Sequence, residues 1–280
     1  MNPMLPIIAA LALGGSFDLV EPPTADELAA GFVPLGSVRY HPGRGEIEVD
    51  GHFNLRGGFL EFLACLPEAK PHESLLALDC DPADLKAALL LLGLKEGRRP
   101  RSEADLAPLE GDRVIIRLRY QFQNADGETV LRDLRAEDGI INGPMEYEMA
   151  RCGFVFTGSS FIEDLTAETA EGEKPPEIFA PRALGQLIAL CHRPYAILDN
   201  PLALPYRDGD YYAYSDVFPA MTGESPPLVT MVIRKPRLGE IHSHVTRMEL
   251  PPIKQVIIDD EVKDPANDSL EDDSERKGER

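Results

Sequence analysis

Hydrophobic and polar residues alternate with the two-residue period of a half-buried β-strand in several segments of the chain. The clearest is residues 113–122, which a turn joins to a second predicted strand at 128–134. Residues 38–41 and 46–53 are predicted to form a similar pair around the turn Pro-Gly-Arg-Gly. Further strands are predicted at residues 59–66, 74–79, 153–157, 187–191, 228–234 and 245–250.

One segment has the pattern of a helix instead. Asp81 is a suitable N-cap, Pro82 fits the first helical position, and Gly93 is suited to end the helix. Further apolar residues at Leu90 and Leu91 favour a helix that is buried on more than one side. The helix itself is predicted by apolar residues that repeat at helical spacing, namely Leu85, Ala88, Leu89 and Leu92.

One helix among many strands, without alternation of strands and helices, predicts an α+β fold. We expect a mainly antiparallel β-sheet with one well-capped buried helix over residues 82–92. The polar segment 163–176 is expected to be an insertion loop.

The two ends of the chain differ from the part between them. An apolar run of about 10 residues at Met4–Leu13, followed by small residues, predicts a signal peptide over residues 1–16. A buried N-terminal strand is the alternative, because no Lys or Arg precedes the run. Residues 24–258 are predicted to form the folded domain. Residues 259–280 carry ten acidic and four basic residues, which predicts a disordered acidic tail.

Composition narrows the classes of function. The chain of 280 residues is 43% hydrophobic, enough for a sizeable core, and its net charge is −20. Such a charge argues against a nucleic-acid partner, because like charges repel. No run of 18 apolar residues occurs, so no membrane span is expected.

Four cysteines are spaced too widely for a zinc knuckle or a redox pair. In an oxidising compartment disulfides are allowed, with three possible connectivities, and buried free thiols are the alternative. The cysteines are Cys65, Cys80, Cys152 and Cys191.

An ordered set of motifs resembles the YdjY-domain proteins, particularly the secreted members of planctomycete-type bacteria. It comprises Gly-Gly-Phe-Leu-Glu at 57–61, His-Glu-Ser at 72–74, the leucine-rich helix with Gly93, and Phe-Thr-Gly-Ser at 156–159. The resemblance covers roughly residues 32–234. Phe154 stands where such proteins often carry Trp, and either ring suits aromatic packing. The resemblance implies fold and export, and it carries no reaction with it.

Candidate ligand-binding residues are His72, Glu73 and Ser74, which follow Pro71 in a segment expected to be extended. His72 and Glu73 would contribute to a ligand pocket or to proton transfer. The alternative is that His72 hydrogen-bonds a loop backbone while Ser74 helps to position the start of a strand. Ser159 joins this candidate set through the Gly-Ser motif, although the motif lacks the second glycine of a nucleophile elbow.

Two further patterns have both a functional and a purely structural interpretation. Tyr211 and Tyr212 belong to an aromatic and acidic cluster that suits either carbohydrate or cation recognition, or an ordinary strand and turn. His242 and His244 would share one face of a strand, as metal ligands do, but an exposed polar strand is the alternative. The basic run at residues 98–101 is interpreted as a solvated loop rather than an anion site.

These observations favour an exported, secreted or periplasmic protein that binds a ligand or an envelope partner without catalysis. No cofactor is expected. The alternative is a metal-dependent or hydrolytic enzyme that uses His72 and Glu73, or His242 and His244.

Overall fold

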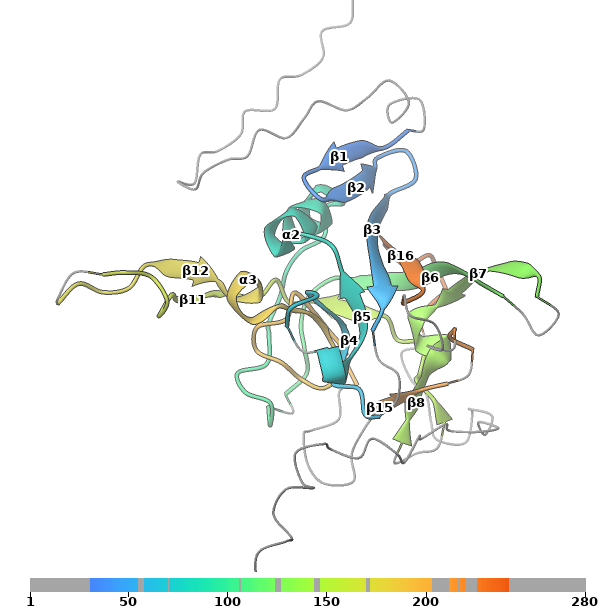
Figure 1. Cartoon of the computed structure of the whole chain (residues 1–280). Coiled ribbons are helices and arrows are strands. Elements are labelled where there is room, and N and C mark those ends of the chain that lie inside the picture. Colours follow the sequence, from blue (N-terminus) through green and yellow to red (C-terminus); the bar gives the residue numbers. More distant parts are fainter. Residues whose placement is uncertain are drawn as a thin grey trace, which may run out of the picture.

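The computed structural model describes residues 31–54, 58–69, 71–105, 107–123, 127–143, 147–169, 172–202, 212–215, 217–219 and 226–241 (Figure 1). Strands predominate in this part of the chain, and two α-helices and two 3-10 turns accompany them. Most of the strands belong to one sheet of eleven strands.

Eight strands of this sheet close into a barrel. They are β3 (Glu46–Phe53), β4 (Phe62–Cys65), β5 (Ser74–Leu78), β6 (Arg113–Gln123), β10 (Phe154–Phe156), β13 (Gln186–Ala189), β14 (Leu198–Asp199) and β16 (Leu228–Arg234). Pairing runs from β3 through β16, β6, β10, β14, β13 and β4 to β5, and β5 pairs back to β3. Neighbouring strands are antiparallel, except that β13–β14 and β4–β5 are parallel.

The remaining strands extend from this barrel or stand beside it. In the large sheet, β1 (Val33–Leu35) and β2 (Val38–His41) lie outside β3, and β7 (Thr129–Arg135) pairs with β6. A separate hairpin of β11 (Phe161–Glu163) and β12 (Glu177–Phe179) protrudes as an arm (Figure 1). A small sheet contains β15 (Tyr212–Tyr214), β8 (Ile140–Asn142) and β9 (Tyr147–Glu148).

Strand β3 closes the barrel because it changes partner along one edge. Its first residues pair with β2, while Gly51 and the residues after it pair with β5. A Cβ atom at Gly51 would lie 2.2 Å from the carbonyl oxygen of Ala77 in β5. The absence of a side chain therefore allows β5 to approach β3 closely enough to complete the ring.

The core fills the barrel in the alternating pattern expected of strands. In β3, Ile47, Val49 and Phe53 are buried, whereas Asp50 is exposed. The opposing strands contribute Met231 and Leu118, both fully buried. The fully apolar segments predicted around Phe62 and Leu76 are buried strands β4 and β5.

Helix α2 (Pro82–Leu91) begins where the sequence predicts, with the Asp81 side chain accepting a hydrogen bond of 2.8 Å from the backbone N–H of Ala83. Leu85, Ala88 and Leu89 are fully buried, but Leu90 and Leu91 are 47% and 51% exposed. The helix packs against β2 and against the short helix α3 (Ala180–Leu184). The expectation that α2 is buried on more than one side is therefore wrong.

The predicted fold class is wrong as a whole. The structure is a mostly β protein built on a closed eight-stranded barrel with two helices, rather than an α+β sheet with one buried helix over residues 82–92. Alternation marks each strand locally, whereas closure depends on the long-range pairing of β3 with β5. Helix α3, at five residues, is too short to show a helical period.

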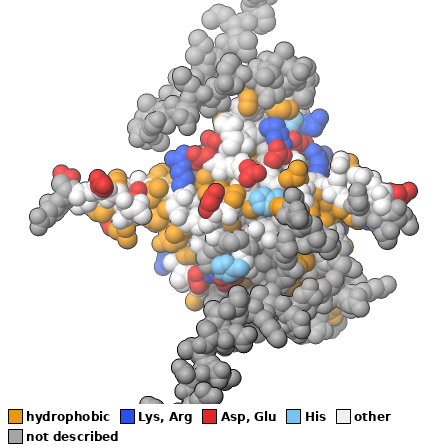
Figure 2. All heavy atoms as spheres, in the orientation of Figure 1, with side chains coloured by type: hydrophobic (Ala, Val, Ile, Leu, Met, Phe, Trp, Pro, Cys, Tyr) orange, Lys and Arg blue, Asp and Glu red, His pale blue; other side chains and the backbone are white. Residues whose placement is uncertain are grey.

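Acidic and basic side chains are intermixed on the outer face over β2 and β3 (Figure 2). Glu48 of β3 accepts from Arg119 of β6 at 3.0 Å, for example. The protruding arm carries the exposed apolar side chains Phe161 and Leu165. In the described ranges no helix has the length and apolar character needed to span a membrane. The predicted signal peptide (1–16), acidic tail (259–280) and strand 245–250 lie outside the described residues.

Candidate functional site

Two short connections between parallel strands meet at one end of the barrel. Parallel neighbours usually need a crossover of a dozen residues or more, yet residues 66–73 join β4 to β5 and residues 190–197 join β13 to β14. The backbone N–H groups of Leu190 and Cys191 both donate to the carbonyl oxygen of Glu61, at 2.9 and 3.1 Å. This contact brings residues 192–195 next to the start of β4.

Arg193 is the centre of an ionic cluster in this region. Its side chain is only 4% exposed, and its guanidinium forms ion pairs with Glu61 and, at 2.6 Å, with Glu103. The same group lies over the ring of Phe62, 5.4 Å from the ring centroid. A buried guanidinium requires such compensation, because removal of its counter-charges would leave an unpaired charge in the protein.

The carboxylates of Glu61 and Glu73 lie close together, and Glu61 is the one that pairs with Arg193. Burial raises the pKa of Glu61, Arg193 opposes this rise, and the nearby carboxylate of Glu73 raises the pKa further. Glu73 ends the 3-10 turn η1 (Pro71–Glu73), and its Oε1 atom lies 3.4 Å from Nε2 of the exposed His72. A continuous row of ionisable groups thus leads from solvent at His72, through Glu73 and Glu61, to the buried Arg193.

A second buried pair fixes the backbone beside Arg193. His192 Nδ1 lies 3.3 Å from Oδ1 of Asp199, and the other carboxylate oxygen accepts from the backbone N–H of Arg193 at 3.3 Å. Burial raises the pKa of Asp199 to about 6, and His192 opposes this effect. Because Asp199 lies in β14, the pair ties residues 192–193 to the barrel.

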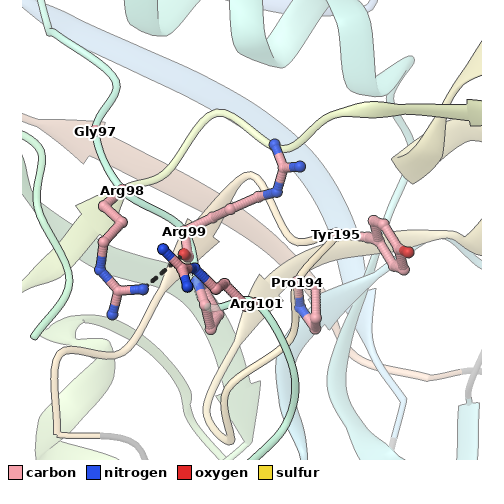
Figure 3. Close-up of a pocket in the computed structure, with 7 residues that line it drawn as sticks. Gly97, Arg98, Arg99, Arg101, Pro194 and Tyr195 are labelled. Atoms are coloured by element: carbon pink, nitrogen blue, oxygen red, sulfur yellow. Dashed lines mark hydrogen bonds between the residues drawn. The ribbon is translucent and has the colours of Figure 1, made fainter. Parts of the chain in front are cut away.

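A pocket of about 450 Å³ opens next to this cluster (Figure 3). One wall is the segment 97–101, which contains three arginines and Pro100, and the other wall is Pro194 and Tyr195. The second wall directly follows Arg193 in the chain. The ion pair between Arg193 and Glu103 therefore joins the two walls behind the pocket.

The three arginines of the pocket differ in what they contact. Arg98 is held by Asp105 at 2.8 Å and by the carbonyl oxygens of Pro108 and Arg99, at 3.1 and 3.3 Å. Within the part of the chain that the structure describes, Arg99 donates only a long hydrogen bond of 3.4 Å, to the carbonyl oxygen of Ser159. Both Arg99 and Arg101 are exposed, and neither forms an ion pair with a carboxylate of the described residues.

The predicted residues His72, Glu73 and Ser74 have three different environments. His72 and Glu73 stand at the solvent end of the ionic cluster, and the His72 side chain is 76% exposed. Ser74 is fully buried in β5, where its hydroxyl donates to the carbonyl oxygen of Leu76 at 2.8 Å. The lining of the 450 Å³ pocket contains none of these three residues.

Ser159 supports the pocket from behind. Its hydroxyl donates to the carbonyl oxygen of Tyr195 at 2.7 Å, and its own carbonyl accepts from Arg99. It adopts φ +62°, a left-handed conformation that is uncommon for a residue other than glycine. Gly158 before it has φ +75°, a backbone conformation that glycine adopts without steric strain.

Tyr212 is buried in the core, 1% exposed, and its hydroxyl donates to the carbonyl oxygen of Leu202 at 2.8 Å. This environment matches the interpretation of the aromatic cluster as a strand at this position. Tyr211, His242 and His244 lie outside the described residues. Within the described ranges, no three His, Cys, Asp or Glu side chains are grouped to hold a metal ion.

All four cysteines are free. Burial raises the pKa of the Cys80, Cys152 and Cys191 thiols to about 12. Thiols with such a pKa stay protonated near neutral pH and are poor nucleophiles.

The sequence did not mark the residues that line the pocket. The sequence predicts a solvated loop for the run Arg-Arg-Pro-Arg at 98–101, and its three positive charges are the available signal of a site. Pro194 and Tyr195 carry no motif, and their position depends on the pairing of β13 with β14. Arg193 was likewise not distinguishable in sequence from a surface arginine.

The fold and the pocket define a β-barrel domain with an arginine-lined pocket beside the connection between β13 and β14. The sequence profile of the YdjY domain matches residues 44–224, so the chain belongs to the YdjY domain family. No curated protein matches the chain. No solved structure matches it either.

Proposed function

We propose that this YdjY-domain protein is an exported, non-enzymatic module of the cell envelope that binds an anionic ligand in the arginine-lined pocket. The observation that carries this proposal is the pair Arg99 and Arg101 at a pocket of about 450 Å³, without carboxylate partners among the described residues. Binding pockets for small molecules commonly have volumes of roughly 300–1,000 Å³.

The positive charge of the pocket lining contrasts with the negative net charge of the chain. In a chain of net charge −20, a concave site with three guanidinium groups is a local reversal of sign. Guanidinium groups bind carboxylates and phosphates through two parallel hydrogen bonds, so the site is suited to an anion. Export is supported by the apolar run at Met4–Leu13.

Calorimetric titration of the full chain with galacturonate and with inorganic phosphate tests the proposal. We expect at least one of these anions to bind, more weakly at high salt, and the double variant R99Q/R101Q to lose at least tenfold in affinity. R44Q is the matched control, because Arg44 is an exposed arginine of the turn after β2 and does not line the pocket. Equal binding by R99Q/R101Q and the unmodified protein, or no binding of either anion, would refute this function.

Fractionation tests the cellular location separately. We expect the protein in the periplasmic or secreted fraction, without residues 1–16. Retention in the cytosol would contradict export and leave anion binding as a separate question.

A second candidate is proton transfer at the carboxylates Glu61 and Glu73, which the raised pKa of Glu61 favours. A hydrolytic activity that falls at least a hundredfold in E61Q, while anion binding is unchanged, would establish it. In that case His72 at the solvent end of the cluster would face the substrate.

A further inference from the structure

From the arrangement of the pocket we infer that its ligand is a dicarboxylate with a ring body, such as an acidic disaccharide. This inference rests on the proposed function and specifies the ligand. It follows from which guanidinium groups are available, how they are separated, and what lies between them.

Two positive charges are available to a ligand. The guanidinium of Arg98 is occupied by Asp105 and by backbone carbonyl oxygens. Among the described residues, Arg99 makes only its long contact with the Ser159 carbonyl, and the Arg101 contact with Asp105 comes from the backbone N–H rather than the side chain. A ligand that neutralises both free guanidinium groups needs two anionic groups.

The two guanidinium groups stand apart. Pro100, which separates Arg99 from Arg101 in the sequence, is buried. Its ring fixes its own backbone φ, and it restricts the backbone of Arg99 to an extended conformation. Figure 3 shows the two side chains leaving the chain in different directions, so that their guanidinium groups do not converge on one point. One compact oxyanion such as phosphate therefore has little chance to engage both, whereas two separate carboxylates match them.

The wall opposite the arginines consists of two residues whose side chains contain rings. Pro194 and Tyr195 are half-buried, and both form the wall opposite the arginines (Figure 3). The Tyr195 ring offers a flat apolar face with a polar edge, on which the apolar face of a sugar or another ring can pack. Since Ser159 holds the Tyr195 carbonyl at 2.7 Å, this wall is fixed before a ligand binds.

Titration of the full chain with digalacturonate, galacturonate, neutral galactobiose and inorganic phosphate tests this inference. We expect digalacturonate to bind at least tenfold more tightly than galacturonate or phosphate, and galactobiose to bind more weakly than either acid. R99Q and R101Q are each expected to reduce the advantage of digalacturonate over galacturonate to less than threefold, while R44Q keeps it. Thermal melts of the variants, whose substituted side chains are exposed, verify that they remain folded.

Equal affinity for digalacturonate and galacturonate, or tightest binding of phosphate, would overturn the dicarboxylate inference and leave anion binding standing. If neither acid nor phosphate binds, the proposed function fails together with it. Galactobiose binding as tightly as digalacturonate would overturn the inference in favour of a neutral sugar.

Discussion

Arg193 and Glu103 form an ion pair of 2.6 Å that joins the two walls of the pocket. Arg193 directly precedes the Pro194–Tyr195 wall, and Glu103 follows the arginine segment 97–101. The guanidinium is 4% exposed and Glu103 is 54% exposed, so one end of the pair is fixed in the protein and the other reaches the surface. The pocket therefore depends on a charge whose compensation comes from both Glu61 and Glu103.

Substitution of Arg193 by Gln should destabilise the protein by about 3–5 kcal/mol, because Glu61 then remains in the interior without its counter-charge. Urea denaturation monitored by circular dichroism measures this loss. R151Q is the control, since Arg151 pairs with Asp138 at the surface, where a pair contributes about 1 kcal/mol or less. Similar stability losses in R193Q and R151Q would show that the buried cluster is not important for folding.

Asp199 makes the free energy of unfolding depend on pH in a defined direction. Burial raises the pKa of its carboxyl to about 6 in the folded protein, above the value of about 3.9 expected when unfolded. The folded state therefore binds more protons between these values, and this contribution to stability is complete below pH 4 and lost as the pH rises through 6.

The variant D199N removes this titration. We expect the stability difference between D199N and the unmodified protein to change by about 2–3 kcal/mol between pH 4 and pH 7, in favour of the variant at the higher pH. Denaturant melts of both proteins across this range give the difference, and other carboxylates cancel in it. A difference that is constant with pH would show that Asp199 does not titrate in this range.

The two neighbouring leucines of α2 provide a test of how the helix packs. Leu89 is fully buried, so L89A should cost about 2–5 kcal/mol through the cavity it leaves. Leu90 is 47% exposed, and L90A should cost about 1 kcal/mol or less. Equal losses in urea melts would contradict the one-sided burial of the helix.

The local parts of the fold are visible in the sequence, and the reasons differ from element to element. Helix α2 is predictable because Asp81, Pro82 and the leucine spacing are encoded within a dozen residues. Strands β3 and β16 are found at the predicted bounds, because β3 alternates along its length and β16 is mostly apolar. Strand β14, Leu198–Asp199, is two residues long and has no period to detect.

The candidate site depends on long-range pairing, which sequence patterns do not reveal. Glu73 is linked to Arg193 through Glu61, which lies beside Arg193 because β4 pairs with β13. The motif that contains His72 and Glu73 does not indicate this neighbour. The basic run at 98–101 has the composition of a surface loop, and it becomes a pocket wall because Pro194 and Tyr195 are placed opposite it. A parallel connection as short as residues 190–197 is also unexpected from general rules of sheet topology.

Closure of the barrel gives the last prediction, at Gly51. An added Cβ would lie 2.2 Å from the Ala77 carbonyl oxygen, a backbone atom that moves only if β5 moves away from β3. G51A should therefore destabilise the protein by about 1–3 kcal/mol or more, although alanine normally strengthens a strand relative to glycine. The control is G43A in the turn after β2, where an added Cβ has no neighbour within 4 Å and the expected change is within about 0.5 kcal/mol. Hydrogen exchange of the amide N–H groups of β5 locates the effect, because weakened β3–β5 pairing should increase exchange there more than in β16. Unchanged stability in G51A would mean that β3 and β5 are not held at this separation, and the eight strands would then form an open sheet.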